Sequence, residues 1–146
     1  MEIKSRNPNY KQYVIDKRSN NKFATHIGFN ITQIEEGKIE AQTTFENFMQ
    51  QQDGFVHGGI TSAFADMACG FASYSMVEPG QRVMTVEIKI SYFNKGDGDK
   101  IVARGSVLKA GKRFHFCEAE IFSVHQGVYT LMAKASSTMA VIALKD

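Results

Sequence analysis

The most regular hydrophobic pattern in the chain lies in residues 84–92, where apolar and polar side chains alternate. Each even-numbered position from Met84 to Tyr92 is apolar, and each odd-numbered position from Thr85 to Ser91 is polar. Strict alternation is typical of a half-buried β-strand, because successive side chains of a strand point to opposite faces. We therefore expect a strand whose apolar residues all lie on one face and whose polar residues lie on the other.

Five further β-prone runs surround this one, each bounded by turn residues. Two of them lie in residues 27–45 and meet at the sequence EEGK, where Gly37 is expected to take a positive φ. The others follow the turn NKGDGDK, are separated by AGKR and HQGV, and span residues 101–110, 114–124 and 129–142. The pattern as a whole predicts two strands before a helix and four after it.

One long helical pattern, from Gly59 to about Val77, separates these two groups and stops at Pro79 and Gly80. The helix is apolar on nearly every side, which a small domain can bury only if a sheet curves around it. The order of elements predicts the α+β class, with a long antiparallel sheet wrapped around one central helix. A sheet that leaves an edge or a face open tends to pair with a second copy, so we expect at least a dimer.

The length of 146 residues suggests a single domain, which we place at residues 25–146. Residues 1–24 form a polar leader that we expect to be peripheral. A helix is expected within it at about residues 10–17, because Tyr10 and Tyr13 fall at helical spacing. The leader lacks the apolar core of a signal peptide.

Composition excludes several classes of protein. With 17 basic and 15 acidic residues the net charge is only +2, which argues against a dedicated nucleic-acid binder. No apolar run reaches the roughly 18 residues needed to span a membrane. These features predict a cytoplasmic protein that binds neither nucleic acid nor membrane.

The cysteines and histidines do not form a recognisable metal site. Cys69 and Cys117 lie in apolar surroundings without a CxxC spacing, which predicts buried, reduced thiols. None of the four histidines has a histidine partner two or four residues away. We therefore expect no metal and no cofactor.

The stretch GFVHGGITSAFAD, residues 54–66, carries the candidate chemistry because Asp66 is the only acid in an apolar run. It allows a metal ligand, a phosphate cradle or a catalytic acid beside an anion site at the start of the helix. HGG is not a dinucleotide-binding fingerprint, but glycines at a helix start leave backbone N–H groups able to bind an oxyanion. A purely structural role, with Asp66 hydrogen-bonded to a neighbouring strand, is the competing interpretation, since a buried carboxylate needs a partner.

The sequence HGGITSAFADMACGFAS, residues 57–73, resembles the central-helix motif of PaaI-type hotdog-fold acyl-CoA thioesterases. TVEIKISYFN and GDKIVARGSVLKAGKRFHFCEAEIF resemble the strands that follow this helix in the family, so the resemblance covers roughly residues 25–142. It implies a hotdog fold in which two protomers join their sheets and build two active sites at the interface. It also implies an acyl-CoA substrate and a homodimer or a dimer of dimers.

The resemblance assigns roles to individual residues. Asp66 takes the place of the catalytic acid, as general base or nucleophile, and Gly58 that of the backbone N–H donor to the thioester carbonyl. Thr85 matches a strand hydroxyl that reaches across the dimer to help hold the attacking water. Gln51 stands where many relatives carry asparagine, and Gln52 is an alternative for the same amide role.

Other residues are expected to hold the substrate or to support the site. His57 is interpreted as bracing the loop before the helix, in preference to direct catalysis, and Gly59 as a second backbone contact to substrate. Four basic residues are candidates for gripping the coenzyme A phosphates, since cationic side chains suit phosphate oxygens: Lys89, Lys109, Lys112 and Arg113.

Thioester hydrolysis matches these residue types, because its tetrahedral oxyanion needs preorganised donors and its water needs a base. Two alternatives remain. One is a non-catalytic acyl-CoA-binding hotdog protein, which would have the same pocket. The other is a hotdog hydratase or dehydratase, although the chain lacks a DxNPxH-like run.

Overall fold

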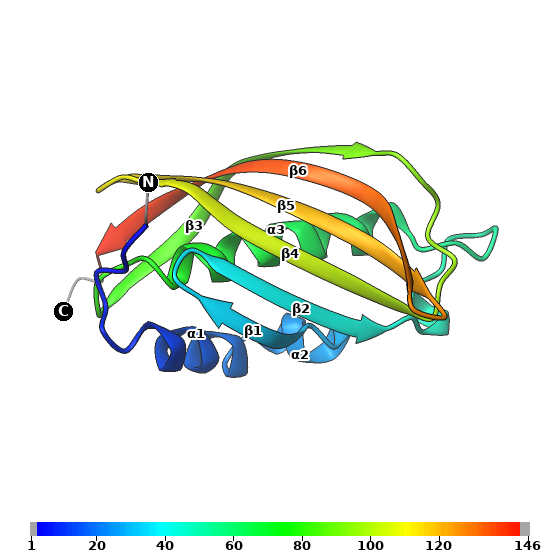
Figure 1. The fold of residues 1–146 in the computed structure, drawn as a ribbon, viewed down its shortest axis with the longest axis horizontal. Coiled ribbons are helices and arrows are strands. Elements are labelled where there is room, and N and C mark those ends of the chain that lie inside the picture. The colour runs from blue at the N-terminus through cyan, green and yellow to red at the C-terminus, as the bar shows by residue number, and fades with distance from the viewer. Residues whose placement is uncertain (1–2, 144–146) are drawn as a thin grey trace.

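Six antiparallel strands form one sheet that curves around the long helix α3 (Figure 1). The computed structural model describes residues 3–143 of the chain. The strand order in the sheet is β1-β2-β4-β5-β6-β3. This arrangement confirms the predicted α+β class and the hotdog architecture. The elements, in chain order, are α1 (Tyr10–Ser19), α2 (Lys22–Ile27), β1 (Asn30–Glu35), β2 (Lys38–Thr44), the 3-10 helix η1 (Asn47–Met49), α3 (Gly58–Tyr74), β3 (Gln81–Tyr92), β4 (Lys100–Ala110), β5 (Phe114–His125) and β6 (Val128–Ala143).

The helix α3 lies on the concave face of the sheet, and the main core forms between them. Phe64, Ala65, Ala68 and Ala72 of this helix are fully buried. The helix comes closest to the sheet at Gly105 of β4, where a Cβ atom would lie 2.1 Å from the carbonyl oxygen of Ala68. Glycine is required there because any side chain would push the helix off the strand.

The alternation that predicted β3 is broken by a β-bulge at Val86. Thr85 pairs with Met139 and Glu87 pairs with Thr138, so Val86 has no partner on β6. An extra residue shifts the phase of a strand by one, because side chains alternate with period two. As a result Met84, across from Ala140, is exposed on the outer face, while Ile88 and Ile90 after the bulge pack against the core. The prediction of one uniform apolar face is therefore wrong for Met84 and for Val86 at the bulge, both of which are exposed.

The N-terminal helices pack onto the domain. Val14 of α1 and Ala24 of α2 are fully buried. The ring of Tyr13 meets that of Tyr74, near the end of α3, edge to face with a centroid distance of 6.1 Å. The helix expected within the leader is present as α1, and α2 spans the boundary that we placed after residue 24. Helix α1 therefore packs against α3.

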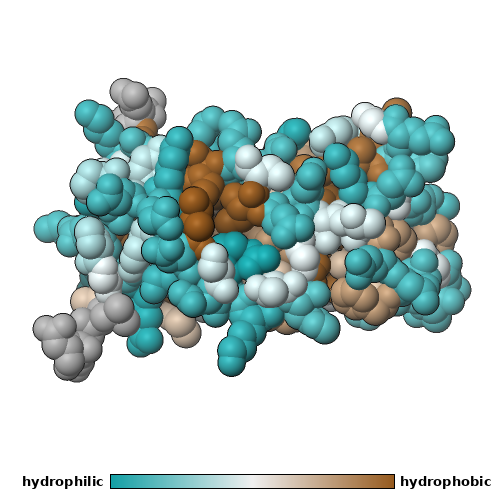
Figure 2. All heavy atoms as spheres, turned by 90° about the horizontal axis from the view of Figure 1, so that it is seen from below, coloured by the Kyte–Doolittle hydropathy of each residue, from teal (hydrophilic) through white to brown (hydrophobic). Residues whose placement is uncertain are grey.

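The two edges of the sheet differ in how they are covered. Helix α1 runs beside β1, where Ile15, Ile31 and Ile34 line a groove and Arg18 donates a hydrogen bond to the carbonyl of Phe29. Figure 2 views this side and shows hydrophobic side chains among a mainly polar surface. At the other edge, β3 pairs only with β6, and within residues 3–143 no element pairs with its outer side.

Candidate active site

The N-terminus of α3 presents an unused backbone donor at Gly58. His57 is the N-cap residue, and its Nδ1 atom accepts a hydrogen bond from the Gly59 N–H at 2.7 Å. The next amide groups, those of Ile60 and Thr61, donate to the carbonyl of His57. In the described part of the chain the Gly58 N–H has no acceptor. The helix dipole makes such a donor suited to an oxyanion.

The loop before α3 is closed by the side chain of Gln51. Its Oε1 atom accepts hydrogen bonds from the backbone N–H groups of Asp53, at 2.6 Å, and Phe55, at 3.2 Å. The carbonyl end of the amide is therefore committed to the loop, and the Nε2 end is the one left to donate to a substrate. Gln52 is exposed on the same loop.

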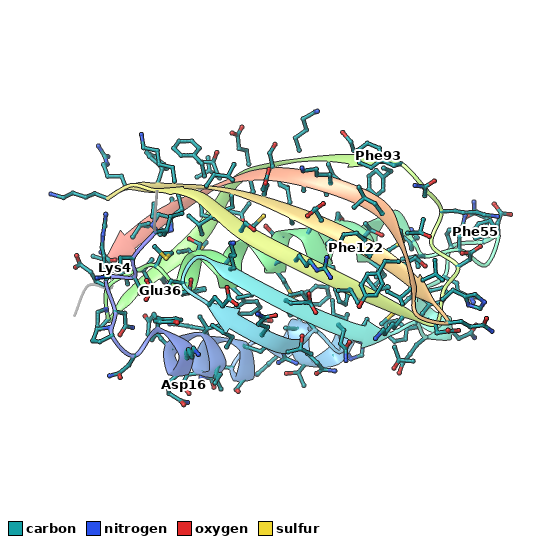
Figure 3. The ribbon with its side chains drawn as sticks, in the orientation of Figure 1. Lys4, Asp16, Glu36, Phe55, Phe93 and Phe122 are labelled. Atoms are coloured by element: carbon teal, nitrogen blue, oxygen red, sulfur yellow. The ribbon has the colours of Figure 1, made fainter. Side chains whose placement is uncertain are left out.

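An open cavity of about 420 Å³ lies beside Gly58, lined in part by Gln51, Phe55, Tyr92 and Lys95. The hydroxyl of Tyr92 donates to the carbonyl of Gly58 at 2.9 Å, which ties the end of β3 to the start of α3. Phe55 lies at the tip of the loop that precedes α3, at one end of the molecule (Figure 3). This cavity surrounds the donor half of the candidate site.

The acid half of the site lies further along α3. Asp66 is half-buried, and its Oδ1 atom accepts a hydrogen bond of 2.7 Å from the Thr85 hydroxyl. The bulge at Val86 makes this contact possible, because it turns Thr85 toward the helix. The contact forms within one chain, and the expected role of Thr85 across the dimer stays a prediction. A second cavity, of about 180 Å³, is bordered by both residues.

Gly58 and Asp66 are too far apart to act on one carbonyl within a single chain. They are eight residues apart on α3, which corresponds to about 12 Å along the helix axis at 1.5 Å per residue. The two residues also border different cavities. Each chain therefore carries the candidate backbone donor and the candidate acid as two separate halves of a site.

Neither cysteine is a plausible nucleophile beside these halves. Cys69 and Cys117 are free and buried, as expected. Burial raises the pKa of both thiols, that of Cys117 to about 12, so neither is a thiolate at neutral pH. Within residues 3–143 no group of three or more His, Cys, Asp or Glu side chains is placed to hold a metal ion. In the same part of the chain, no helix combines the length and apolar character needed to cross a bilayer.

The sequence profile of the Thioesterase superfamily matches residues 53–130, a segment that contains Gly58, Asp66 and Thr85. The chain belongs to the thioesterase superfamily. It is thus a thioester hydrolase, and the resemblance drawn from its helix motif is confirmed.

Known relatives of this thioesterase are similar over most of its length. The proofreading thioesterase EntH of Klebsiella pneumoniae is 25% identical over 108 residues, which cover 74% of this chain and 79% of that protein. A 1,4-dihydroxy-2-naphthoyl-CoA hydrolase of Listeria monocytogenes is 25% identical over 95 residues, which cover 65% and 77%.

Solved structures show the same fold. A thioesterase family protein of Silicibacter pomeroyi superposes with a TM-score of 0.90 at 28% identity, covering 92% of this chain and 98% of that one. The Escherichia coli PaaI protein superposes with a TM-score of 0.82 at 24% identity, covering 92% and 94%.

The predicted phosphate-binding residues of the β4–β5 hairpin do not lie beside Gly58 in the same chain. The side chains of Ser73, near the end of α3, and His115, just after the hairpin, share a hydrogen bond of 2.6 Å. The hairpin is therefore at the C-terminal end of the helix, about 22 Å along its axis from Gly58. The residues concerned are Lys109, Lys112 and Arg113.

The course of β3 places Lys89 away from the candidate site and places Tyr92 and Lys95 beside it. Lys89 pairs with Ser136 on the outer face, so the sheet lies between it and α3. Tyr92 and Lys95, which the sequence did not single out, border the Gly58 cavity. Lys95 also lies over the ring of Phe55 at 4.5 Å. Finding them required knowing that the end of β3 meets the start of α3.

Proposed function

We propose that this thioesterase hydrolyses an acyl-CoA to the free acid and CoA in an active site formed by two copies of the chain. The observation that carries the proposal is the separation of Gly58 and Asp66 on one helix. Because one chain cannot bring both to a single carbonyl, Gly58 of one protomer works with Asp66 of the other. The Listeria relative, named as a naphthoyl-CoA hydrolase, supports a CoA thioester as substrate.

The uncovered edge of β3 supports the dimer. This strand has 12 residues, and a long unpaired edge favours addition of a second copy. The Asp66 cavity lies at the Thr85 end of β3, and the Gly58 cavity lies at its Tyr92 end. Antiparallel pairing of two β3 strands about their centre places the Thr85 end of one strand opposite the Tyr92 end of the other. This two-fold symmetry forms two active sites, each built from the Gly58 half of one chain and the Asp66 half of the other.

In the proposed reaction the Gly58 N–H donates to the thioester carbonyl oxygen, and the Nε2 of Gln51 lies in reach of the same group. Thr85 holds one carboxylate oxygen of Asp66, which leaves the other to take a proton from water. The water oxygen adds to the carbonyl carbon, and the tetrahedral oxyanion is stabilised by the helix-terminal donor. Collapse breaks the carbon–sulfur bond, and the proton passes from Asp66 to the leaving sulfur.

The same two-fold symmetry gives the basic hairpin a role. The hairpin lies at the end of α3 away from Gly58, so in the dimer the second copy's hairpin approaches the Gly58 end of the first. We place the CoA phosphates against this surface, because its exposed cations suit phosphate oxygens. The residues are Lys109, Lys112 and Arg113.

Subunit complementation tests the shared site. Asp66→Asn removes the base and is expected to lower thiol release at least about 100-fold, and Gln51→Ala damages the donor half. When the two variants are unfolded and refolded together, half the dimers are mixed and each mixed dimer has one intact site. About one quarter of wild-type activity should return, since each site uses one half from each chain.

The controls separate the possible failures. Each variant refolded alone should stay at its own low activity, and Gln50→Ala, on the same loop, should keep wild-type turnover. No recovery in the mixture would mean that both halves act within one chain. Near-normal hydrolysis by a folded Asp66→Asn variant would exclude Asp66 as the base.

A further inference from the structure

The peptide unit between Gly58 and Gly59 is held by side chains at both of its ends. Its carbonyl oxygen accepts a hydrogen bond of 2.9 Å from the Tyr92 hydroxyl. Its N–H donates to the Nδ1 atom of His57 at 2.7 Å. The leading N–H groups of a helix have no partner within the helix, and only some of them are capped by a side chain. This peptide unit is therefore fixed more firmly than the start of a helix requires.

The peptide unit before it carries the Gly58 N–H and is held through its carbonyl alone. The carbonyl oxygen of His57 accepts from the Ile60 N–H at 2.9 Å and from the Thr61 N–H at 3.2 Å. Hydrogen bonds that share a peptide unit polarise one another, so a carbonyl that accepts twice strengthens the donor at the other end of its unit. Within residues 3–143 that donor, the Gly58 N–H, has no acceptor and is left for a substrate.

The two glycines differ in why a side chain is missing. A Cβ atom at position 59 would lie 3.0 Å from the Nδ1 atom of His57, so glycine there admits the cap. A Cβ atom at position 58 would lie 3.6 Å from the nearest atoms of Tyr92, which is an ordinary contact. Because glycine is conformationally free, the direction of the Gly58 N–H depends on what holds the peptide units on its two sides. The bond from Tyr92 supplies that support on one side.

Tyr92 is placed to act through the backbone of α3. It is the last residue of β3, and the next N–H, that of Phe93, donates to the carbonyl of Met132 at 2.7 Å, which anchors this end of the strand. The hydroxyl proton of Tyr92 is committed to the Gly58 carbonyl and is not free to donate to a thioester. The side chain is 54% exposed, so it adds little to the core.

We infer that Tyr92 is a positioning residue for the oxyanion donor. Together with His57 it holds the peptide between Gly58 and Gly59 at both ends, which keeps the Gly58 N–H in one direction at the border of its cavity. The inference rests on the proposed function, in which this N–H donates to the thioester carbonyl. Loss of the hydroxyl frees the peptide unit to turn, so stabilisation of the oxyanion weakens while substrate binding is kept.

The kinetic test compares Tyr92→Phe with Tyr13→Phe, because each substitution removes a phenol hydroxyl that donates to a backbone carbonyl. The acceptor of Tyr13 is Gln81, at the opposite end of β3. Thiol release is measured with acetyl-CoA, hexanoyl-CoA and benzoyl-CoA. Tyr92→Phe should lower kcat about tenfold and leave KM within about twofold, a smaller loss than the roughly 10²–10³-fold expected when an oxyanion donor is removed outright. Tyr13→Phe should keep the wild-type kcat.

Infrared spectroscopy of bound substrate gives a readout that does not depend on turnover. The substrate hydrolysed fastest, isotopically labelled at its thioester carbonyl, is bound to the Asp66→Asn variant, which should leave it intact. A hydrogen bond from the Gly58 N–H should lower the carbonyl stretching frequency. Adding Tyr92→Phe to this variant should reduce the shift, and adding Tyr13→Phe should leave it unchanged.

Several outcomes would overturn the inference. Equal kcat in the two phenylalanine variants, or a carbonyl shift unaffected by Tyr92→Phe, would show that the hydroxyl does not position the donor. A higher KM at unchanged kcat would mean that the hydroxyl contacts the substrate directly, and loss of the dimer would assign Tyr92 to packing between protomers. If the wild type releases no thiol, or if Asp66→Asn alone gives no carbonyl shift, the proposed function itself fails. A shift that is present but insensitive to Tyr92 defeats only this inference.

Discussion

His115 makes the stability of the protein depend on pH. It is 1% exposed, its Nδ1 shares a hydrogen bond with the buried Ser73 hydroxyl, and its Nε2 has no partner among the described residues. Burial, with a smaller contribution from the charge of Arg6, lowers the pKa of His115 from 6.5 to about 4. Between about pH 4 and pH 6.5, therefore, the imidazole is neutral in the folded protein and protonated in the unfolded chain.

The sign and size of the effect follow from proton linkage. Above pH 6.5 the imidazole is neutral in both states, and its contribution to stability is fully present. As the pH falls from 6.5 toward 4, protons bind the unfolded chain first and the free energy of unfolding decreases. Each pKa unit corresponds to about 1.4 kcal/mol, so the loss is about 2 kcal/mol at pH 5 and about 3 kcal/mol in full.

Urea denaturation at pH 7 and pH 5, followed by circular dichroism at one protein concentration, measures this loss. The matched control is the double variant Ser73→Ala/His115→Phe, which removes both partners and leaves neither group unpaired. Carboxylates titrate in both proteins, so the difference between their pH profiles isolates the imidazole. Wild type should lose about 2 kcal/mol more than the control between the two pH values. Parallel profiles would refute the reasoning.

Two further predictions concern packing and substrate affinity. Gly105→Ala should lower the free energy of unfolding by about 1–3 kcal/mol, because its Cβ would overlap the Ala68 carbonyl. Gly70→Ala should raise the free energy of unfolding by about 1 kcal/mol, because alanine is the better helix former. Equal effects of the two substitutions in urea denaturation would contradict this. Lys112→Glu/Arg113→Glu should raise KM about tenfold for acyl-CoA but not for the matching acyl-pantetheine, since only CoA carries the nucleotide phosphates. A similar rise in KM with both substrates would exclude the β4–β5 hairpin as the phosphate-binding surface.

The order and type of the main elements could be predicted because they follow from local patterns. Alternation and β-prone runs predicted the strands, turn residues predicted their ends, and a helix apolar on nearly every side required a curved sheet. The leader was harder to interpret, because a polar stretch gives no sign that Val14 and Ala24 will be fully buried. Only the docked position of α1 and α2 shows that Asn21 reaches the candidate site.

The residues of the candidate site could be singled out in part from the sequence. Asp66 stood out as the only acid in an apolar run, and Gly58 as a glycine at a helix start. The placement of Thr85 could not be derived, because a bulge depends on how two strands pair. Lys95 could not be found either, since its position follows from the closure of the sheet at the start of α3.

The bulge at Val86 also affects how this chain is compared with its relatives. It divides β3 into two segments of opposite phase, so an ungapped alignment to a strand without a bulge would match Thr85 with a residue of the outer face. For the same reason, deleting Val86 could leave the strand paired and the helix packed while turning the Thr85 hydroxyl away from Asp66. A single inserted or deleted residue at this edge can therefore break the Thr85–Asp66 hydrogen bond without unfolding the domain.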